Sequence, residues 1–169
     1  MSNPHSLSNE IQQIPQVLWV GIGCKRGTSW KLIDLAIEQV FRENQLFPSA
    51  IAGIATIDTK ALEVGLVKLC RLRNLPLTTF SAEILRSVCV PNPATITDDK
   101  VGTPSVAEAA AILAASQLTS LTVFPFTNIK ELRAKFLVPK QIFQIQGQPG
   151  AVTLAVAQAL NIISITKVS

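Results

Sequence analysis

Apolar runs and amphipathic stretches alternate along the first half of the chain. Residues 17–22 are continuously apolar, which is typical of a strand covered on both faces. A turn at 23–27 follows, and Thr28 or Ser29 can cap a helix whose apolar residues recur at helical spacing as far as Phe41. The pattern predicts a strand, a loop and a helix in succession.

A second unit of the same kind begins at residue 50. Residues 50–56 predict another buried strand, and Asp58 or Thr59 can cap the helix that follows. That helix should end at Asn74 and Pro76. Its apolar stripe consists of Leu62, Leu66, Leu69 and Cys70. The repeated unit predicts parallel strands joined by helices.

Shorter elements follow. Residues 77–80 predict a third strand, and Ser81 can cap a short helix that runs to about Arg86. Residues 89–103 contain several prolines, aspartates and a glycine and predict a loop, and a loop this long in a compact domain is more often functional than idle. Ser105 and Glu108 then have the spacing of a capping box, which predicts a helix whose body, 109–115, is small and apolar.

The last third of the chain alternates less clearly. Its predicted elements are a strand at 121–126, a basic amphipathic stretch at 130–136, another candidate strand at 141–146, a turn at 147–150, a helix at 151–160 and a closing strand at 162–166. Alternating strands and helices predict an α/β fold, a three-layer α/β/α sandwich with a mostly parallel or mixed central sheet. We therefore expect a flexible leader at 1–16 and a single domain at 17–169.

Composition excludes several classes of protein. The chain is 48% hydrophobic and 15% charged, which excludes a disordered chain. Its single histidine, His5, and three cysteines without CxxC spacing leave no histidine-based metal site and no Ser-His-Asp or Cys-His pair, so we expect neither metal nor cofactor. The polar leader lacks a signal-peptide core, and the uncharged stretch 109–129 contains too many polar residues for a membrane span. We expect a cytoplasmic protein with reduced thiols and no membrane partner.

The net charge of +4 comes entirely from residues 109–169, which have five basic side chains and one acidic side chain. A basic half can attract a polyanion, and a mildly basic solvated face explains the same pattern. Nucleic-acid binding would need a denser basic stripe or aromatic stacking platforms, and the sequence has neither. We expect no nucleic-acid partner.

The first turn, Gly21 to Gly27, joins a buried strand to a helix start. Glycines there allow a ligand to approach the backbone, free amide groups of the helix start favour an anion, and Lys25 and Arg26 add positive charge. The glycine spacing misses the dinucleotide-binding pattern, and a tight turn with no ligand explains it equally simply. Basic neighbours and the helix start should lower the pKa of Cys24, which is then either a nucleophile or a small packed residue.

Asp58, Lys60 and Glu63 follow the second strand, at the edge where the glycine turn emerges. Ligands collect at this edge of open α/β sheets. Lys60 could bind a substrate carboxylate while Glu63 or Asp58 orients it or transfers protons. The simpler interpretation is a helix ion pair between Lys60 and Glu63.

Taken together, four motifs resemble one family. They are Gly21-Ile-Gly-Cys-Lys-Arg-Gly27, Ala55-Thr-Ile-Asp-Thr-Lys60-Ala-Leu-Glu63-Val-Gly65-Leu, Phe80-Ser81 and Val101-Gly-Thr-Pro-Ser-Val-Ala-Glu108 with the alanines after it. This combination resembles CobE and the C-terminal domain of CbiG, a family of cobalamin biosynthesis. The resemblance runs from about residue 17 to 115 and resumes near 138–140 and 153–157, while 117–134 is longer than the family norm.

The resemblance implies an α/β domain that binds a polycarboxylate corrin precursor. The ligand-binding positions implied are Gly23, Cys24, Lys25, Arg26, Gly27, Asp58, Lys60, Glu63, Gly102, Ser105 and Glu108, with Val106 beside them. Full-length CbiG-type proteins are cobalt-precorrin-5A hydrolases, which open a lactone and release acetaldehyde. The N-terminal portion of those proteins has no counterpart in this sequence, so the resemblance leaves open whether this chain is catalytic.

Two other interpretations remain. The chain could be a non-catalytic partner that docks on another cobalamin-pathway protein through its alanine-rich helix and basic C-terminal half. It could also be an acyl or lactone hydrolase that uses Cys24.

Overall fold

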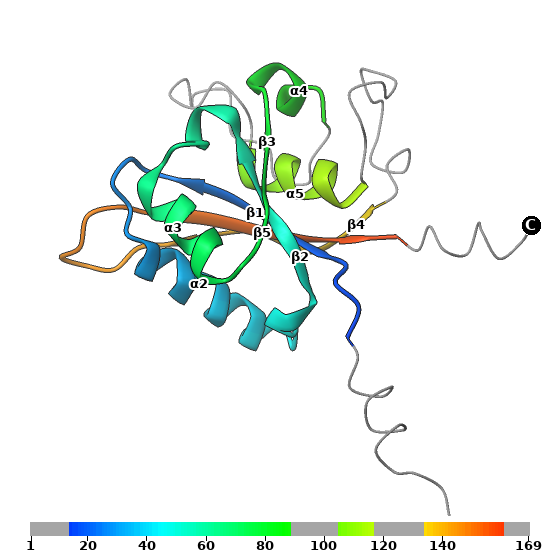
Figure 1. Ribbon diagram of the computed structural model, residues 1–169, viewed down its shortest axis with the longest axis horizontal. Coiled ribbons are helices and arrows are strands. Elements are labelled where there is room, and N and C mark those ends of the chain that lie inside the picture. The colour runs from blue at the N-terminus through cyan, green and yellow to red at the C-terminus, as the bar shows by residue number, and fades with distance from the viewer. Residues whose placement is uncertain (1–13, 89–104, 117–133, 161–169) are drawn as a thin grey trace, which may run out of the picture.

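The computed structural model describes residues 14–88, 105–116 and 134–160. Figure 1 shows the elements in chain order around one sheet. Those up to residue 60 are β1 (Leu18–Cys24), α2 (Trp30–Glu43), the 3₁₀ turn η1 (Pro48–Ala50), β2 (Ile51–Ile57) and the 3₁₀ turn η2 (Asp58–Lys60). Those after it are α3 (Val64–Leu72), β3 (Leu77–Phe80), α4 (Ala82–Arg86), α5 (Val106–Ser116), β4 (Ala134–Phe143) and β5 (Val152–Ala159).

The five strands form one mixed sheet in the order β3-β2-β1-β5-β4. β1, β2 and β3 pair in parallel, as their crossover connections require. β5 runs antiparallel to both β1 and β4 and lies between them. The expected α/β fold is confirmed, with a mixed sheet.

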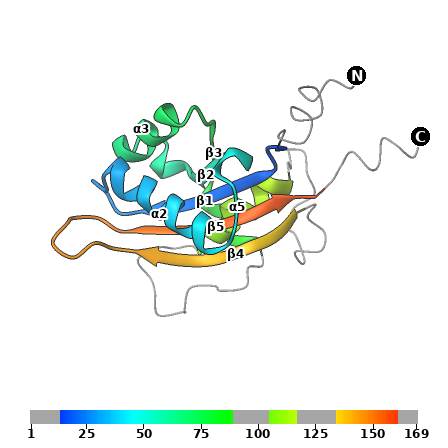
Figure 2. The ribbon, with the colours of Figure 1, turned by 90° about the horizontal axis from the view of Figure 1, so that it is seen from below.

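Helices cover both faces of this sheet, which gives three layers. In Figures 1 and 2, α2 and α3 lie on one face, and in Figure 1 α4 and α5 lie on the other. The α2 face has a core of large aliphatic side chains, with Ile22, Ile37 and Leu154 among those that are fully buried. Arg73, just after α3, also binds Asp34 and Glu38 of α2 at 2.6 and 2.7 Å.

The α5 face is built instead from very small residues. Ala55, Ala155 and Ala157 of the sheet lie in the same cluster as the alanines of α5. A Cβ atom added at Gly21 would lie 2.8 Å from the carbonyl carbon of Ala107 and 2.9 Å from the amide nitrogen of Ala111. Because these are backbone atoms of α5, the helix can lie this close to β1 only where β1 has no side chain.

α5 is buried along nearly its whole length. Every residue from Ala107 to Ser116 is buried, including Glu108, which is fully inaccessible. This burial disfavours the interpretation that the alanine-rich helix docks on a partner protein, because residues 107–116 present no exposed side chain.

The strand-loop-helix units lie close to their predicted bounds. Ser29 caps α2 and Ser81 caps α4, each accepting a hydrogen bond from the amide three residues later, at 3.1 and 3.2 Å. β3 has its predicted bounds, and 147–150 is the predicted turn, here of the β4–β5 hairpin.

The predicted helix at 151–160 is wrong, because 152–159 is β5. The segment is rich in alanine and leucine, which favour helices. Its side chains alternate between the two faces of the sheet, however, with Val152, Leu154 and Val156 in the α2 core and Ala155 and Ala157 against α5. A central strand buried on both faces loses the polar alternation that would have identified it.

The start of α3 also differs from prediction. Asp58 and Thr59 lie in η2 rather than capping the helix, and α3 begins six residues after Asp58, with Glu63 at the cap position. Leu62 is therefore not part of the buried stripe. Its side chain is 88% exposed, whereas Leu66 and Leu69 are fully buried.

Several predicted features lie outside the described residues. They are the leader up to residue 13, the loop at 89–103, the strand at 121–126, the closing strand at 162–166 and the residues Cys89, Gly102, Lys130, Arg133 and Lys167. The basic stretch at 130–136 is described only from Ala134, where β4 begins.

Candidate functional site

The predicted site segments come from one edge of the sheet, where β1, β2 and β3 end. Cys24 at the end of β1 pairs with Val152 at the start of β5, so the β4–β5 hairpin turn lies at this edge too. The first turn of α5 also reaches it, since a Cβ atom on Gly23 would lie 4.0 Å from the Cβ of Val106. Residues 23–28, 58–63 and 105–108 thus come from neighbouring elements.

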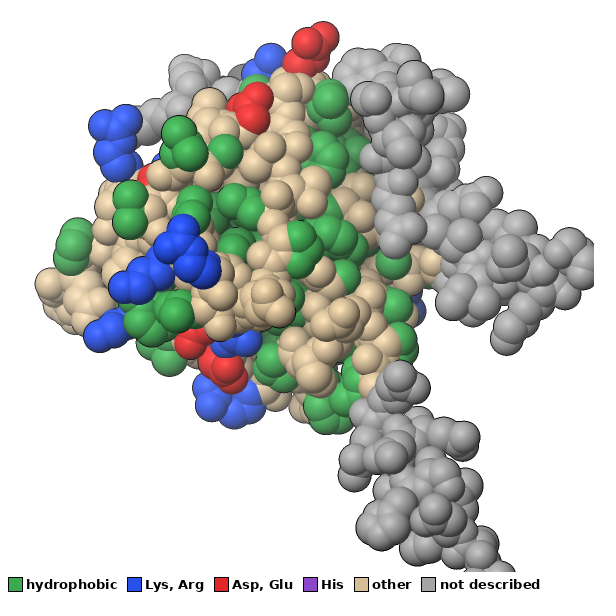
Figure 3. All heavy atoms as spheres, in the orientation of Figure 1, with side chains coloured by type: hydrophobic (Ala, Val, Ile, Leu, Met, Phe, Trp, Pro, Cys, Tyr) green, Lys and Arg blue, Asp and Glu red, His purple; other side chains and the backbone are tan. Residues whose placement is uncertain are grey.

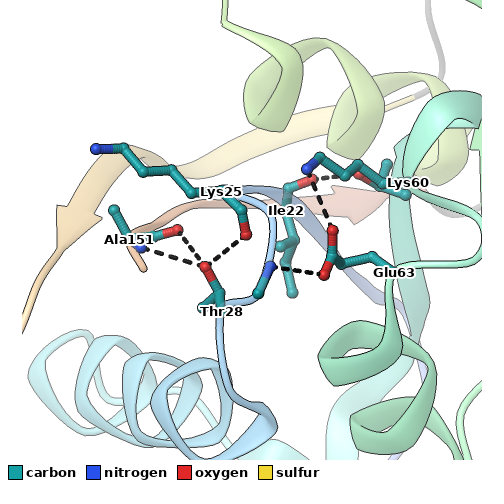
Figure 4. Close-up of polar contacts among 8 residues, drawn as sticks. Ile22, Lys25, Thr28, Lys60, Glu63 and Ala151 are labelled. Carbon is teal, nitrogen blue, oxygen red and sulfur yellow. Dashed lines mark hydrogen bonds and ion pairs between the residues drawn. The ribbon is translucent and has the colours of Figure 1, made fainter. Parts of the chain in front are cut away.

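Thr28 fastens the loop after β1 to the start of β5, as Figure 4 shows. Its side chain is buried, and its hydroxyl donates to the Lys25 carbonyl at 2.7 Å and accepts from the Ala151 amide at 3.2 Å. The Lys25 amide donates back to the Ala151 carbonyl at 3.1 Å. The loop is therefore held from the β5 side by backbone groups and one threonine.

Glu63 holds the same loop from the other side. One carboxylate oxygen accepts from the Gly27 amide at 3.0 Å, and the other lies 3.4 Å from the Lys60 ammonium nitrogen (Figure 4). The predicted Lys60–Glu63 ion pair is therefore present. The hydrogen bond from the Gly27 amide to Glu63 connects the loop after β1 to the segment after β2.

Gly65 brings the start of α3 against this loop. A Cβ atom at Gly65 would overlap the Thr28 carbonyl oxygen and lie 3.1 Å from the Trp30 amide nitrogen. The absence of a side chain at Gly65 lets the two loops meet closely enough for Glu63 to reach Gly27.

The amides of the loop are less available to a ligand than the sequence suggested. The amide groups of Lys25, Gly27 and Thr28 all donate within the protein, to Ala151, Glu63 and Lys25 respectively. The free amides predicted for an anion are those of the helix start, where the Leu32 amide donates to the Ser29 hydroxyl. The compact loop satisfies its own donors.

The basic side chains do not all converge. Lys25 and Arg26 are exposed, and Figure 4 shows the Lys25 ammonium pointing away from the Lys60–Glu63 pair, towards the β4–β5 side. Lys60 is largely covered, with 22% of its side chain exposed. Asp58 lies exposed in η2, and its carbonyl accepts from the Ala61 amide.

Cys24 does not have the lowered pKa expected of a nucleophile. Burial raises the pKa of its thiol to about 11. Nearby Lys60 lowers this pKa and Glu63 raises it, and neither effect is as large as that of burial. A thiol with this pKa is protonated at neutral pH and is a poor nucleophile. The structure favours the alternative interpretation of Cys24 as a small packed residue.

Ser105 and Glu108 do not form the predicted capping box. The Glu108 carboxylate accepts from the Lys140 amide of β4 at 2.9 Å, which ties α5 to the edge strand. Ser105 has a left-handed backbone, with φ of 48°, and its buried hydroxyl has no hydrogen-bond partner in the described part of the chain. A left-handed serine cannot present its hydroxyl to the helix amides as a cap does, because capping requires extended backbone angles.

Sequence reasoning missed three contributors to this edge. Thr28 was expected only as a helix cap, because its contact with Ala151, far away in the sequence, cannot be recognised from the neighbouring residues. Leu62 and Val64, on either side of Glu63, are 88% and 77% exposed, although Leu62 was expected in the buried stripe. No local signal distinguishes an exposed leucine from a buried one when the helix cap is expected at Asp58 or Thr59 and lies at Glu63.

On the face drawn in Figure 3, the basic side chains of the described residues lie among acidic and apolar ones and form no continuous stripe. Within the same residues, no cluster of His, Cys, Asp and Glu could hold a metal ion, and no helix is long and apolar enough to cross a membrane.

The family and sequence comparisons point in one direction. A family model described as "Cobalamin synthesis G C-terminus" matches residues 18–157. Cobalt-precorrin-5A hydrolase from Priestia megaterium is 31% identical over 107 residues, which are 63% of this chain and 29% of that protein. The enzyme of the same name from Salmonella typhimurium is 32% identical over 89 residues, or 48% and 25% of the two chains. The chain thus spans less than a third of these relatives.

Solved structures agree with this match. The crystal structure of CobE, a protein from the cobalamin biosynthetic pathway, has a TM-score of 0.68 and 26% identity, over 88% of this chain and 97% of CobE. The cobalamin biosynthesis protein chiG from Agrobacterium tumefaciens has a TM-score of 0.55 and 28% identity, over 86% of this chain and all of chiG. Both similarities extend over nearly the whole of the proteins compared.

Proposed function

The chain belongs to the family of the cobalamin synthesis G C-terminus, and from this membership we propose that it binds a polycarboxylate corrin precursor at the carboxyl edge of its sheet. The observation that supports the proposal most is the meeting of residues 23–28, 58–63 and 105–108 at that edge. These are the segments whose motifs resemble CobE and CbiG. A ligand held there would contact family motifs from three separate parts of the sequence.

The chemistry of the edge suits such a ligand. Corrin precursors have acetate and propionate groups around an apolar ring. Lys25, Arg26 and Lys60 supply cations of the kind that bind carboxylates. Leu62 and Val64 supply exposed apolar side chains next to Lys60 in the chain, and aliphatic groups can cover the face of a macrocycle.

Titration of the purified chain with cobyrinic acid, followed by its visible absorption spectrum, tests this proposal. We expect saturable binding that Arg26→Ala and Lys60→Ala weaken by roughly fivefold or more, the scale of a charge-assisted hydrogen bond. Lys135→Ala is the matched control, because this exposed lysine pairs with Gln158 at the opposite edge of the sheet. Equal weakening by all three variants would refute the proposed site.

A second candidate function is that of one part of a cobalt-precorrin-5A hydrolase. Two relatives with that name match this chain over a quarter to under a third of their length. The chain would then present the corrin precursor to a partner that contains the remaining portion. Acetaldehyde release from cobalt-precorrin-5A by the chain alone, and by the chain mixed with that portion, distinguishes a complete enzyme, a split enzyme and a binding protein.

A hydrolase that depends on Cys24 is disfavoured by its protonated thiol. If the chain hydrolyses a lactone, Cys24→Ser should retain the activity. Loss of activity in a folded Cys24→Ser protein would restore that candidate.

A further inference from the structure

We propose that the Gly27 amide and the Lys60 ammonium form a binding subsite for one carboxylate of the ligand, which Glu63 fills until the ligand displaces it. This inference rests on the proposed function and adds to it the chemical group recognised at one position. Glu63 is then a competitor of the ligand, rather than the residue that orients it.

The geometry of Glu63 is that of a bound carboxylate. Its two oxygens engage two donors from different loops, Gly27 at 3.0 Å and Lys60 at 3.4 Å. An amide and an ammonium group arranged in this way match the two oxygens of any carboxylate. An acetate or propionate arm of the ligand needs the same two donors and cannot use them while Glu63 does.

The Gly27 amide and the backbone of Lys60 are held in place by contacts other than the Glu63 carboxylate. The loop that contains Gly27 is fastened to β5 through Thr28 and Ala151, and Gly65 fits against it from α3. Lys60 ends η2, where its own carbonyl accepts from the Glu63 amide. Departure of the Glu63 side chain would therefore leave the Gly27 amide in place and the Lys60 ammonium without its partner Glu63, so that both can bind an arriving carboxylate.

The Glu63 side chain does not cap α3. It occupies the cap position of α3, yet its side chain makes no capping hydrogen bond. Its removal from Gly27 therefore takes no hydrogen bond from the helix.

The subsite is accessible from the surface. Gly27 is exposed, and 22% of the Lys60 side chain and 11% of the Glu63 side chain reach solvent. Rotation of the Glu63 side chain outward, past its exposed neighbours Leu62 and Val64, would uncover both donors.

Nuclear magnetic resonance of the full chain tests this inference through the Gly27 amide signal. The probes are propane-1,2,3-tricarboxylate, a small polycarboxylate without a ring, and cobyrinic acid. In the wild type, both should shift the Gly27 signal as Glu63 leaves. Glu63→Gln and Glu63→Ala should tighten binding of both probes by roughly five- to tenfold, since each removes a charged competitor.

Glu43→Gln is the control, because it removes the same charge from an exposed residue at the end of α2. Among the contacts described, the Glu43 side chain only accepts a hydrogen bond from Gln39. It should leave both affinities unchanged. Unchanged or weaker binding in the Glu63 variants would overturn the inference, as would equal tightening in Glu43→Gln. If a Glu63 variant fails to fold, the shift of the Gly27 signal in the wild type still tests the subsite. A Gly27 signal that does not shift at saturating probe would overturn the subsite.

The two probes separate this inference from the proposed function. Cobyrinic acid that binds without moving the Gly27 signal would support corrinoid binding and overturn the subsite. A tricarboxylate that moves Gly27, more readily in Glu63→Gln, would support the subsite even if cobyrinic acid fails to bind and the proposed function falls.

Discussion

The close approach of α5 to β1 makes Gly21 the position where one methyl group should cost most. In Gly21→Ala, the new Cβ would lie 2.8 Å from the Ala107 carbonyl carbon and 2.9 Å from the Ala111 amide nitrogen, and closer still to the Ala107 carbonyl oxygen. Ordinary contacts begin at 3.4 Å, so α5 must move away from the sheet by more than half an ångström. Backbone atoms cannot rotate out of the way as a side chain does.

The expected cost follows from overpacking. Inserting one methyl group into a well-packed core costs about 1–3 kcal/mol, and the displaced helix here is buried along its length. We expect a loss of about 3 kcal/mol, which lowers Tm by roughly 6–12 °C in a domain of this size. Denaturant unfolding followed by circular dichroism measures the loss.

Gly23→Ala is the matched control on the same strand. Its Cβ would meet the Thr153 and Val106 Cβ atoms at 3.9 and 4.0 Å, which are ordinary contacts, so we expect a change below about 1 kcal/mol. A Gly21→Ala protein as stable as Gly23→Ala would refute the close packing of α5 on β1.

Two further outcomes are expected. Thr28→Val removes the hydroxyl that is hydrogen-bonded to the Lys25 carbonyl and the Ala151 amide, and it should lower the free energy of unfolding by about 1–3 kcal/mol in the same denaturation assay. An unchanged free energy of unfolding would show that other contacts hold the loop. Burial raises the pKa of Cys24 and of Cys70 from 9.0 to about 11, so iodoacetamide should label the native chain slowly at pH 8 and faster towards pH 11. Because the thiols of the unfolded chain lose their protons at lower pH than those of the folded chain, the free energy of unfolding should be unaffected by them below pH 9 and should fall between pH 9 and 11. The fall should be less steep in a Cys24→Ser, Cys70→Ala protein, and equal slopes would contradict the raised pKa values.

The local features of the strand-helix units were predictable because short-range chemistry determines them. Ser29 and Ser81 each precede a helix and satisfy its first amides, and both caps form as expected. The apolar run at the start of the domain gives β1, and the glycine turn follows it.

Long-range contacts decided the features that were missed. The helix predicted at 151–160 is β5, because pairing with both β1 and β4 outweighs the helix preference of its alanines and leucines. Glu108 has the spacing of a capping residue but accepts a hydrogen bond from Lys140, 32 residues away. Neither partner can be identified from the neighbouring sequence.

The candidate site shows the same division. The meeting of its segments was predictable, since loops after parallel strands leave the same edge of a sheet. The state of its groups was not, because Glu63 uses the Gly27 amide and burial raises the pKa of Cys24 more than Lys60 lowers it. Distances and burial in the folded chain, rather than residue types, determine these properties.

Amide hydrogen exchange with and without saturating cobyrinic acid tests most directly whether the carboxyl edge of the sheet is the ligand site. The account predicts slower exchange at 23–28, 58–63 and 105–108, and unchanged exchange around Lys135 at the opposite edge. Protection confined to the opposite edge, or no protection in a chain saturated with ligand, would contradict it.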